Sequence, residues 1–259
     1  MSDLHFGAGN GLDDPRLEQA IGDLVERVSP AVVVASGDLT HRGLRSEHEA
    51  AAKYLRALGR PLLVIPGNHD IPTWPPGRFT HPYREFERCW GTTSASFSAP
   101  GLEIAGLCSV QPLGYQRGHV KGHDLERAEA RLREAPEGAL RVATLHHQLT
   151  GAPWRNTKLP VKGRKSLLAR LAAAGAELIL GGHIHQATVV ERQDFQVVTG
   201  DSHTCVIATA PGLGRPRPSR AFETRGVLVH RADESSLTVE THVWRDEDWA
   251  LTGTRTFPR

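Results

Sequence analysis

The sequence of 259 residues contains little cysteine, little net charge and no long hydrophobic run. Its three cysteines lie far apart and in no CxxC spacing, which excludes a disulfide framework or a cysteine zinc knuckle. No apolar stretch approaches the ~20 residues that cross a bilayer, so we expect no membrane association. Lysine and arginine number 31 against 29 acidic residues, and this balance gives no reason to expect nucleic-acid binding. No basic, apolar leader is present, and we expect a cytoplasmic protein.

Histidine, in contrast, is abundant, with 14 residues that call for an explanation. Hydrophobic residues make up 39% and charged residues 23% of the chain, which excludes a disordered or fibrous protein. The sequence shows neither an internal repeat nor a clear linker, and its length suits one large domain. We therefore expect a single domain over residues 1–259.

The hydrophobic pattern predicts alternating helices and strands, followed by a β-rich part. Helices are expected at residues 13–28, 46–58, 122–134 and 163–174, the first capped by Asp14 and the second opened by a capping box from Ser46 to Glu49. Buried strands are expected at residues 31–35, 61–65, 140–145 and 177–180, paired strands at 94–98 and 102–109, and a proline-rich loop at 71–82. Strand-like alternation follows at residues 187–191, 195–199, 226–230 and 237–243. The pattern predicts an α/β protein with a large mixed sheet system.

Four polar clusters follow the predicted buried strands, and a fifth opens the chain. They are Asp3-Leu4-His5, Gly37-Asp38, Gly67-Asn68-His69-Asp70, His146-His147 and Gly182-His183-Ile184-His185. Ligands of open α/β sheets bind outside the carboxyl ends of the strands, so we expect the five clusters to converge on one place.

The residue types in these clusters are those of a metal site without cysteine. Seven side chains are candidate ligands, namely Asp3, His5, Asp38, Asn68, His146, His183 and His185. Each of these residues alone has an ordinary structural explanation, either as a turn residue or as a histidine whose ring nitrogens are hydrogen-bonded. Together they exceed the needs of one open tetrahedral zinc and fit two metal ions that share a carboxylate. Histidines of the clusters also account for much of the histidine excess.

The five clusters resemble the sequence blocks of the calcineurin-like metallophosphoesterases, over residues 2–185. Their spacing is most similar to that of the bacterial class III cyclic-nucleotide phosphodiesterases. The resemblance implies a four-layer α/β-β/α sandwich, in which residues 1–185 form the metal-site core and residues 186–259 complete the second sheet.

The resemblance also implies a role for each matching residue. One metal ion would be held by Asp3, His5, Asp38 and His185, and the other by Asp38, Asn68, His146 and His183. Asp38 would bridge the two ions and take part in catalysis. His69 would bind no metal and would face the scissile phosphate as the second catalytic residue, while His147 would stand behind the ligands. The donor set admits Mn, Fe or Zn as the two divalent ions.

The function that the resemblance implies is hydrolysis of a phosphate diester by a metal-bound hydroxide. The expected substrate is a small molecule, either a cyclic nucleotide or one of a broad range of small diesters. A phosphomonoesterase or nucleotide pyrophosphatase on the same scaffold is the main alternative, and a non-catalytic interaction module is a third. The β-rich part is expected either to complete the second sheet or to form the edge of a homodimer.

The chain departs from the related sequences at several points. His41 replaces an acidic residue, and Gln148-Leu149 replaces a pair of prolines. No strand precedes Asp3, so we expect further residues upstream of Met1 or another segment in that position, and otherwise a weaker metal at Asp3 and His5. Three arginines of a proline-rich segment could reach a substrate phosphate or simply face solvent, namely Arg215, Arg217 and Arg220.

Overall fold

A computed structural model describes every residue of the chain except 10, 13, 115, 151–157, 187, 196–201 and 215–224. The three arginines of the proline-rich segment therefore lie outside the described residues. The helices are α1 (Pro15–Val28), α2 (Arg45–Ala57), α3 (Gly77–Thr80), α4 (Arg84–Trp90), α5 (Gly122–Arg133) and α6 (Arg164–Ala173). None of the helices in the described part is long and apolar enough to span a membrane.

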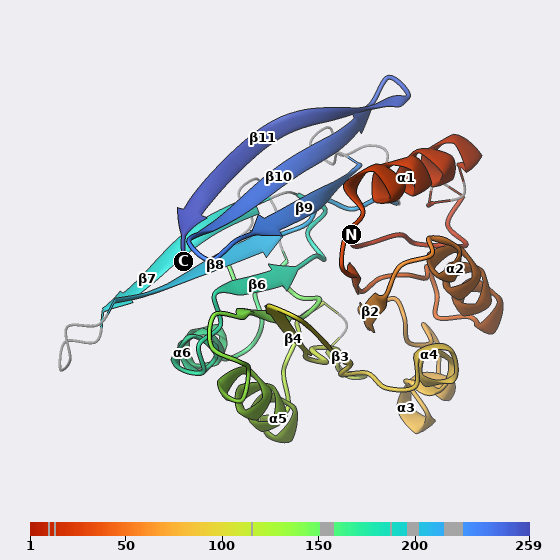
Figure 1. The fold of residues 1–259 in the computed structure, drawn as a ribbon. Coiled ribbons are helices and arrows are strands. Elements are labelled where there is room, and N and C mark those ends of the chain that lie inside the picture. Colours follow the sequence, from red (N-terminus) through yellow and green to blue (C-terminus); the bar gives the residue numbers. More distant parts are fainter. Residues whose placement is uncertain are drawn as a thin grey trace.

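The strands fall into three sheets (Figure 1). The first sheet pairs β1 (Val33–Ser36) with β2 (Leu62–Ile65). The second has the order β3-β4-β5-β6-β8-β7, from β3 (Ser96–Ala99), β4 (Leu102–Gly106), β5 (Leu140–Thr144), β6 (Leu178–Gly181), β7 (Thr188–Phe195) and β8 (Ser202–Thr209). The third has the order β11-β10-β9, from β9 (Gly226–Ala232), β10 (Ser236–Arg245) and β11 (Asp248–Pro258).

The six-stranded sheet is mixed and is covered on both faces. Strands β4, β5, β6 and β8 are parallel, and the outer strands β3 and β7 are antiparallel to their neighbours. Alternate residues of one strand enter different cores: Ala143 packs with α5 and α6, whereas Val142 packs against the other two sheets. Burial on both faces explains the continuous apolar runs of these strands.

The four-layer α/β-β/α arrangement predicted from the sequence is confirmed. Helices α5 and α6 cover the outer face of the six-stranded sheet. Its inner face meets β2, β10 and β11, and helices α1 and α2 cover β1 and β2 from outside. Figure 1 shows α5 and α6 on one side of the molecule and α1 and α2 on the other.

Most predicted helices and strands lie within a few residues of their expected bounds. The strand predicted at residues 195–199 falls almost entirely outside the described residues, and strands β8 and β11 were not predicted. The predicted loop at residues 71–82 contains the short helix α3, and α4 follows it, because the prolines stop short of residue 77 except for Pro82. The predicted capping box from Ser46 to Glu49 is wrong. Helix α2 begins one residue earlier, and the Glu47 carboxylate accepts the backbone N–H of Leu44 at 3.2 Å instead.

The first residues of the chain run beside β1. The α-amino group of Met1 donates to the Val34 carbonyl at 2.8 Å, and the Met1 carbonyl accepts the Ser36 N–H at 3.0 Å. The Asp3 N–H then donates to the Gly37 carbonyl at 2.9 Å. This pairing fixes Asp3 and His5 next to the loop that follows β1.

Candidate dinuclear metal centre

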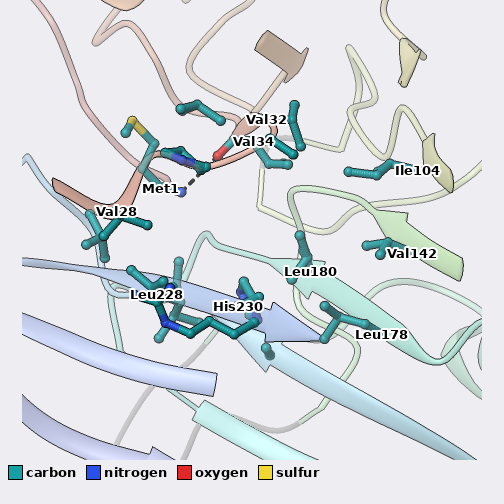
Figure 2. Close-up of a pocket in the computed structure, with 18 of the residues that line it drawn as sticks. Met1, Val28, Val32, Val34, Ile104, Val142, Leu178, Leu180, Leu228 and His230 are labelled. Carbon is teal, nitrogen blue, oxygen red and sulfur yellow. Dashed lines mark hydrogen bonds between the residues drawn. The ribbon is translucent and has the colours of Figure 1, made fainter. Parts of the chain in front are cut away.

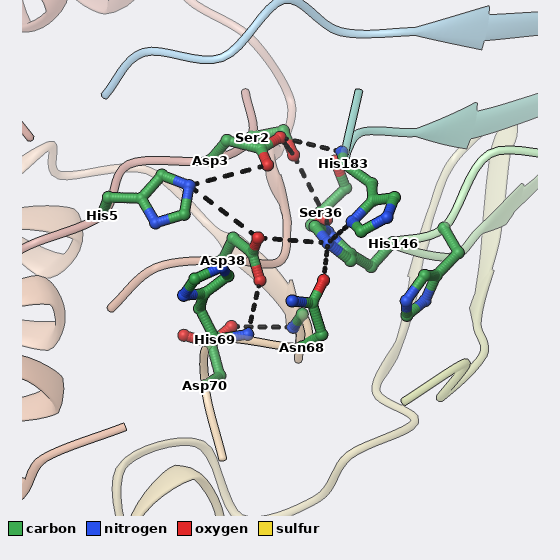
Figure 3. A network of polar contacts seen from close by, with 12 residues as sticks. Ser2, Asp3, His5, Ser36, Asp38, Asn68, His69, Asp70, His146 and His183 are labelled. Carbon is green, nitrogen blue, oxygen red and sulfur yellow. Dashed lines mark hydrogen bonds and ion pairs between the residues drawn. The ribbon is translucent and has the colours of Figure 1, made fainter. Parts of the chain in front are cut away.

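The five polar clusters meet at one edge of the sheets, as the sequence predicts. They occupy the segment beside β1 and the loops after β1, β2, β5 and β6. Figure 3 shows Asp38 at the centre, with His5 on one side and His146 on the other. All seven predicted ligands are buried, and the most exposed of them, His185, has 6% of its surface exposed.

Three groups of side chains in the described part of the chain each bring their ligand atoms within 4.8 Å of one another. The first comprises Asp3, His5 and His185, and the second comprises Asp38, His146 and His183; all their members are buried. The third comprises His5, His41 and His69, has no carboxylate, and is only partly buried. In the first group, the His185 Nε2 atom lies 3.1 Å from Asp3 Oδ1 and 3.3 Å from His5 Nε2. Such separations are those of atoms able to surround one small cation.

Asn68 and Asp38 complete and connect the two groups. The His146 Nε2 atom lies 3.2 Å from His183 Nδ1 and 3.3 Å from Asn68 Oδ1. The Asp38 Oδ2 atom lies 3.4 Å from His146 Nε2 and 3.8 Å from His5 Nε2. This carboxylate therefore faces both groups, which is the position that a bridging ligand takes.

The backbone is strained where these side chains emerge. Positive φ angles occur at five of the predicted ligands, namely Asp3, His5, Asp38, His183 and His185. Residues other than glycine rarely adopt this conformation, and it concentrates at functional sites. Two adjacent glycines are required because neighbouring side chains lie too close for a Cβ atom. A Cβ atom at Gly67 would lie 2.2 Å from Asp38 Oδ1, and one at Gly182 would lie 1.9 Å from Ser2 Oγ.

The buried carboxylates remain ionised. Burial alone raises the pKa of Asp3, but the His185 imidazole more than offsets this effect and leaves the pKa below its ordinary value. Burial likewise raises the pKa of Asp38, and the neighbouring His146 and His69 bring it well below the usual range. Yet Asp3 Oδ1 and Asp38 Oδ2 accept no hydrogen bond of good geometry in the described part of the chain, and each only faces an imidazole, that of His185 or that of His146. A buried anionic oxygen without such a partner is costly unless a cation is bound, so the site fits two metal ions.

Two of the ligand histidines are neutral, as cation binding needs, and one is not. Burial lowers the pKa of His5 to about 3 and that of His183 well below its ordinary value, so both are neutral at neutral pH. Burial also opposes protonation of His146, but the facing Asp38 carboxylate outweighs it and raises the pKa of His146 to about 9. Metal binding must therefore displace a proton from His146.

We accordingly expect metal affinity to rise with pH. His146 carries its proton below about pH 9 in the metal-free protein, so the affinity for a divalent cation should increase up to that pH and then level off. Calorimetric titration with Mn²⁺ or Zn²⁺ at pH 7, in buffers of different ionisation enthalpy, should show about one proton released per chain. The exposed-histidine variant His123→Gln is the matched control and should release the same number, whereas an unchanged affinity between pH 7 and 9 would contradict the expectation.

His69 lies beside the two groups and is held by two hydrogen bonds. Its backbone N–H donates to Asp38 Oδ1 at 2.8 Å, and its Nδ1 donates to the His41 carbonyl at 2.7 Å. The His69 ring lies 4.9 Å from the His5 ring and 5.8 Å from the His41 ring, which stacks on it. Since Nδ1 donates to a carbonyl, proton exchange with a ligand falls to Nε2.

The His147 ring contacts the rings of His146 and His183. Its Nδ1 and the Ser109 hydroxyl are hydrogen-bonded at 2.9 Å, and its ring lies 4.5 Å from that of His183. The ring also packs on Gly118, where an added Cβ would lie 2.5 Å from His147 Cγ. His147 belongs to neither group of converging ligand atoms among the described residues, and its placement behind the ligands stays a prediction.

Asp70 is a site residue that sequence reasoning left without a role. Its carboxylate accepts the N–H of Thr40 at 2.9 Å and the N–H of Gly67 at 2.7 Å, so it ties the loop after β1 to the loop after β2. Burial raises the pKa of Asp70, in contrast to those of Asp3 and Asp38. The only sequence signal for this role was its position at the end of Gly-Asn-His-Asp.

Residues 1–187 match the family model of the calcineurin-like phosphoesterases. A probable cyclic nucleotide phosphodiesterase of Synechococcus is 30% identical over 69% of this chain and 66% of its own length. The 3′,5′-cyclic adenosine monophosphate phosphodiesterase CpdA of Haemophilus influenzae is 27% identical over 68% of this chain and 61% of its own. The chain thus spans somewhat less than two thirds of the length of these relatives.

A shorter match and a solved structure add to these similarities. The glycerophosphodiester phosphodiesterase GpdQ of Enterobacter lignolyticus is 39% identical, but only over 27% of this chain and 28% of its own length. The purple acid phosphatase PPD1 of yellow lupin superposes with a TM-score of 0.66 at 14% identity, covering 100% of this chain and 52% of that one. At this identity the superposition bears on the fold alone.

Proposed function

Because the chain belongs to the calcineurin-like phosphoesterase family, we propose that it is a phosphodiesterase that hydrolyses small phosphate diesters at a dinuclear metal centre. The single observation that carries this proposal is the pair of buried ligand groups with the Asp38 carboxylate facing both, and with His69 beside them. Cyclic nucleotides are the leading substrate class, because the relatives that match over most of the chain carry that activity in their names.

Two divalent cations would supply Lewis acidity, which lowers the pKa of a water molecule toward ~7 and counters charge on the phosphoryl oxygens. Asp3, His5, Asp38 and His185 would hold one of them, and Asp38, Asn68, His146 and His183 the other. The negative charges of Asp3 and Asp38 neutralise only part of the positive charge of two divalent ions. The occupied centre would therefore keep a net positive charge and attract an anion. Mn, Fe and Zn all suit this set of nitrogen and oxygen donors.

His69 would serve the phosphoryl group directly. The hydrogen bond from its Nδ1 to the His41 carbonyl fixes the ring, and Nε2 then donates a proton to the departing alkoxide oxygen. The Asp38 carboxylate, which accepts the His69 N–H, keeps the histidine next to the metal ligands. His41 stacks on His69 and would contact the group that leaves.

A panel of phosphate esters tests this function. The protein, reconstituted separately with Mn²⁺, Zn²⁺ and Fe²⁺, is assayed with 3′,5′-cyclic AMP, 2′,3′-cyclic AMP, glycerophosphoethanolamine and bis(p-nitrophenyl) phosphate. Its activity on p-nitrophenyl phosphate and on a nucleoside diphosphate is measured in parallel. We expect kcat/KM for at least one diester to exceed that for every monoester by about tenfold or more.

Two outcomes would overturn the proposal. Faster turnover of monoesters or of pyrophosphate bonds would assign a phosphomonoesterase or pyrophosphatase activity instead. A protein that binds metal but cleaves none of the esters would support a non-catalytic interaction module.

A further inference from the structure

Exposed large hydrophobic side chains are concentrated at one edge of the molecule. Six are exposed in the described part of the chain, and five of them follow the carboxyl ends of parallel strands. Leu44 follows β1, Trp74 and Phe79 follow β2, Leu113 follows β4, and Leu159 follows β5. The metal ligands lie in loops at the same edge, so we call these five side chains the apolar rim.

Hydrogen bonds connect the segments that carry the apolar rim. The segment after β2 meets the loop after β1 where the Thr73 N–H donates to the Arg42 carbonyl at 3.3 Å. It meets the loop after β4 where Arg78 Nε donates to the Pro112 carbonyl at 2.8 Å. The rim side chains therefore stand on adjoining segments.

The loops after β4 and β5 complete this connection and reach the candidate metal centre. The Lys162 N–H donates to the Gly118 carbonyl at 2.8 Å. Gly118 packs against the ring of His147, which in turn contacts the ring of His183. The apolar rim thus belongs to the same loops that surround the two ligand groups.

The apolar rim exposes side chains that packing would normally cover. Leu113 is 90% exposed and Trp74 is 76% exposed. They do not form the entrance to the apolar cavity of about 420 Å³ between the sheets, because that cavity is lined by residues such as Val142 and Leu180 and by none of the rim (Figure 2). Exposed apolar groups gathered in one place mark a surface that binds a partner or a membrane.

The segments that carry the apolar rim are also basic. They span residues 37–44, 66–83, 107–121 and 145–163 and contain only two acidic residues, Asp38 and Asp70, both of which are buried. Their described parts expose four cationic side chains, namely Arg42, Arg117, Lys121 and Lys162. The net charge of +2 for the whole chain therefore conceals a positive edge.

A hollow of about 510 Å³ lies within this positive edge. Arg117 and Leu159 line it together with Arg164 and Lys165, which open α6, and no acidic side chain is among its described lining residues. Cationic groups beside a leucine suit an anionic headgroup whose hydrocarbon part continues along the apolar side chain.

We propose that the apolar rim docks on the surface of an anionic lipid bilayer. Its leucine and aromatic side chains enter the boundary between headgroups and acyl chains, and the neighbouring lysines and arginines face lipid phosphates. Such binding gains from the apolar area that is buried and from the attraction of basic side chains to anionic lipids. It needs neither a membrane-spanning run nor a large net charge, and it does not depend on which phosphate ester is cleaved.

Other partners suit this edge less well. The cores of protein interfaces are depleted of lysine, whereas this edge exposes Lys121 and Lys162. Single-stranded nucleic acid binds by stacking its bases on aromatic rings, but three of the five rim side chains are leucines. A single nucleobase is too small to cover side chains that come from four separate segments.

Cosedimentation of the whole protein with vesicles tests the docking. Vesicles of phosphatidylcholine alone are compared with vesicles that contain about one third phosphatidylglycerol, at ~0.15 M salt. We expect binding to the anionic vesicles to be at least about tenfold tighter. Brominated lipid should quench tryptophan emission, and Trp74→Phe should remove part of this quenching. Trp249→Phe should not, because Trp249 packs on the core beneath α1.

A leucine pair tests the apolar contribution. Leu113→Ser combined with Leu159→Ser should weaken vesicle binding by about tenfold or more, because both leucines lose their burial in lipid. The matched control is Leu251→Ser, since Leu251 on β11 and Leu159 on the rim are both 56% exposed. This control should bind as the wild type does, and all three substitutions should leave Tm unchanged.

A cation pair tests the charged contribution. Arg117→Glu combined with Lys162→Glu should weaken binding to the anionic vesicles by about tenfold or more and should have little effect with phosphatidylcholine alone. The matched control is Arg27→Glu, because Arg27 is exposed in the last turn of α1, before β1 begins. It should leave binding unchanged.

Four results would overturn the proposal. They are a lack of binding to either kind of vesicle, equal binding to both kinds, an equal effect of Leu251→Ser and of the leucine pair, and tighter binding to a single-stranded oligonucleotide than to the anionic vesicles. None of them would bear on the phosphodiesterase activity, which is measured separately on soluble esters.

Discussion

Replacing Asp38 with asparagine is expected to remove most metal binding from both ligand groups at once. The Oδ2 atom of Asp38 faces His5 of one group at 3.8 Å and His146 of the other at 3.4 Å. An asparagine keeps an Oδ1 acceptor for the His69 N–H but supplies no anionic oxygen between the groups. Metal content, measured by mass spectrometry after reconstitution and dialysis, should fall from about two ions per chain to below one.

The same variant should lose catalysis to a matching degree. Removal of a single preorganised group that stabilises the transition state costs about 10²–10³-fold in rate, and this substitution affects two cation positions together. We therefore expect diester turnover to fall by about 10³-fold or more. The variant Asp23→Asn is the matched control, because Asp23 is exposed and bonds only Gln19 among the described contacts. Unaltered metal content in Asp38→Asn would show that Asp38 does not bridge.

The layers of this fold could be predicted from the sequence, because buried strands and helix faces require apolar residues at recognisable positions. Strands covered on both faces need apolar side chains throughout, as in Leu178–Gly181 and Leu140–Thr144, and their runs are easy to locate. Helix α1 was equally plain, since Asp14 caps it through the N–H of Arg16 and a proline follows at its first position. Gly175, just after the end of α6, has a positive φ, which glycine adopts readily.

The start of helix α2 shows where local pattern fails. Two glutamates, Glu47 and Glu49, stand at spacings that suit a cap. The fold turns Glu47 toward the amides of Arg42 and Leu44, whereas Glu49 pairs with Arg45 and Arg88 on the surface. The approach of α4, which carries Arg88, takes part in this choice. No sequence window around residue 46 contains that information.

The candidate site also has a part that the sequence predicts and a part that it does not. Its ligand types could be read from the sequence, because metal chemistry demands aspartate, asparagine and histidine at strand ends whatever the rest of the chain does. The contacts that hold these ligands in place could not be read from the sequence. Asp70 bonds Thr40, a residue 30 positions away, and His69 bonds the carbonyl of His41. Backbone acceptors carry no side-chain signature, so only the folded arrangement reveals them.

Replacing His69 with alanine is expected to leave metal binding intact and to remove most turnover. His69 lies outside the two groups that contain a carboxylate; among the described residues a nitrogen of its ring converges only with His5 and His41, and its Nδ1 donates to the His41 carbonyl. Its backbone N–H bond to Asp38 survives the substitution. General acid catalysis is typically worth 10²–10⁴-fold, and we expect a loss of kcat within that range.

The dependence of this loss on the leaving group distinguishes proton donation from simple binding. A diester with a good aryl leaving group needs little protonation, so bis(p-nitrophenyl) phosphate should be affected far less than an alkyl diester such as 3′,5′-cyclic AMP. The matched control is His119→Ala, an exposed histidine outside both ligand groups. An equal loss of activity on both substrates would show that His69 only binds the substrate. A loss of metal in proportion to the loss of activity would show that His69 is a metal ligand, because the activity would then fall through the lower metal occupancy.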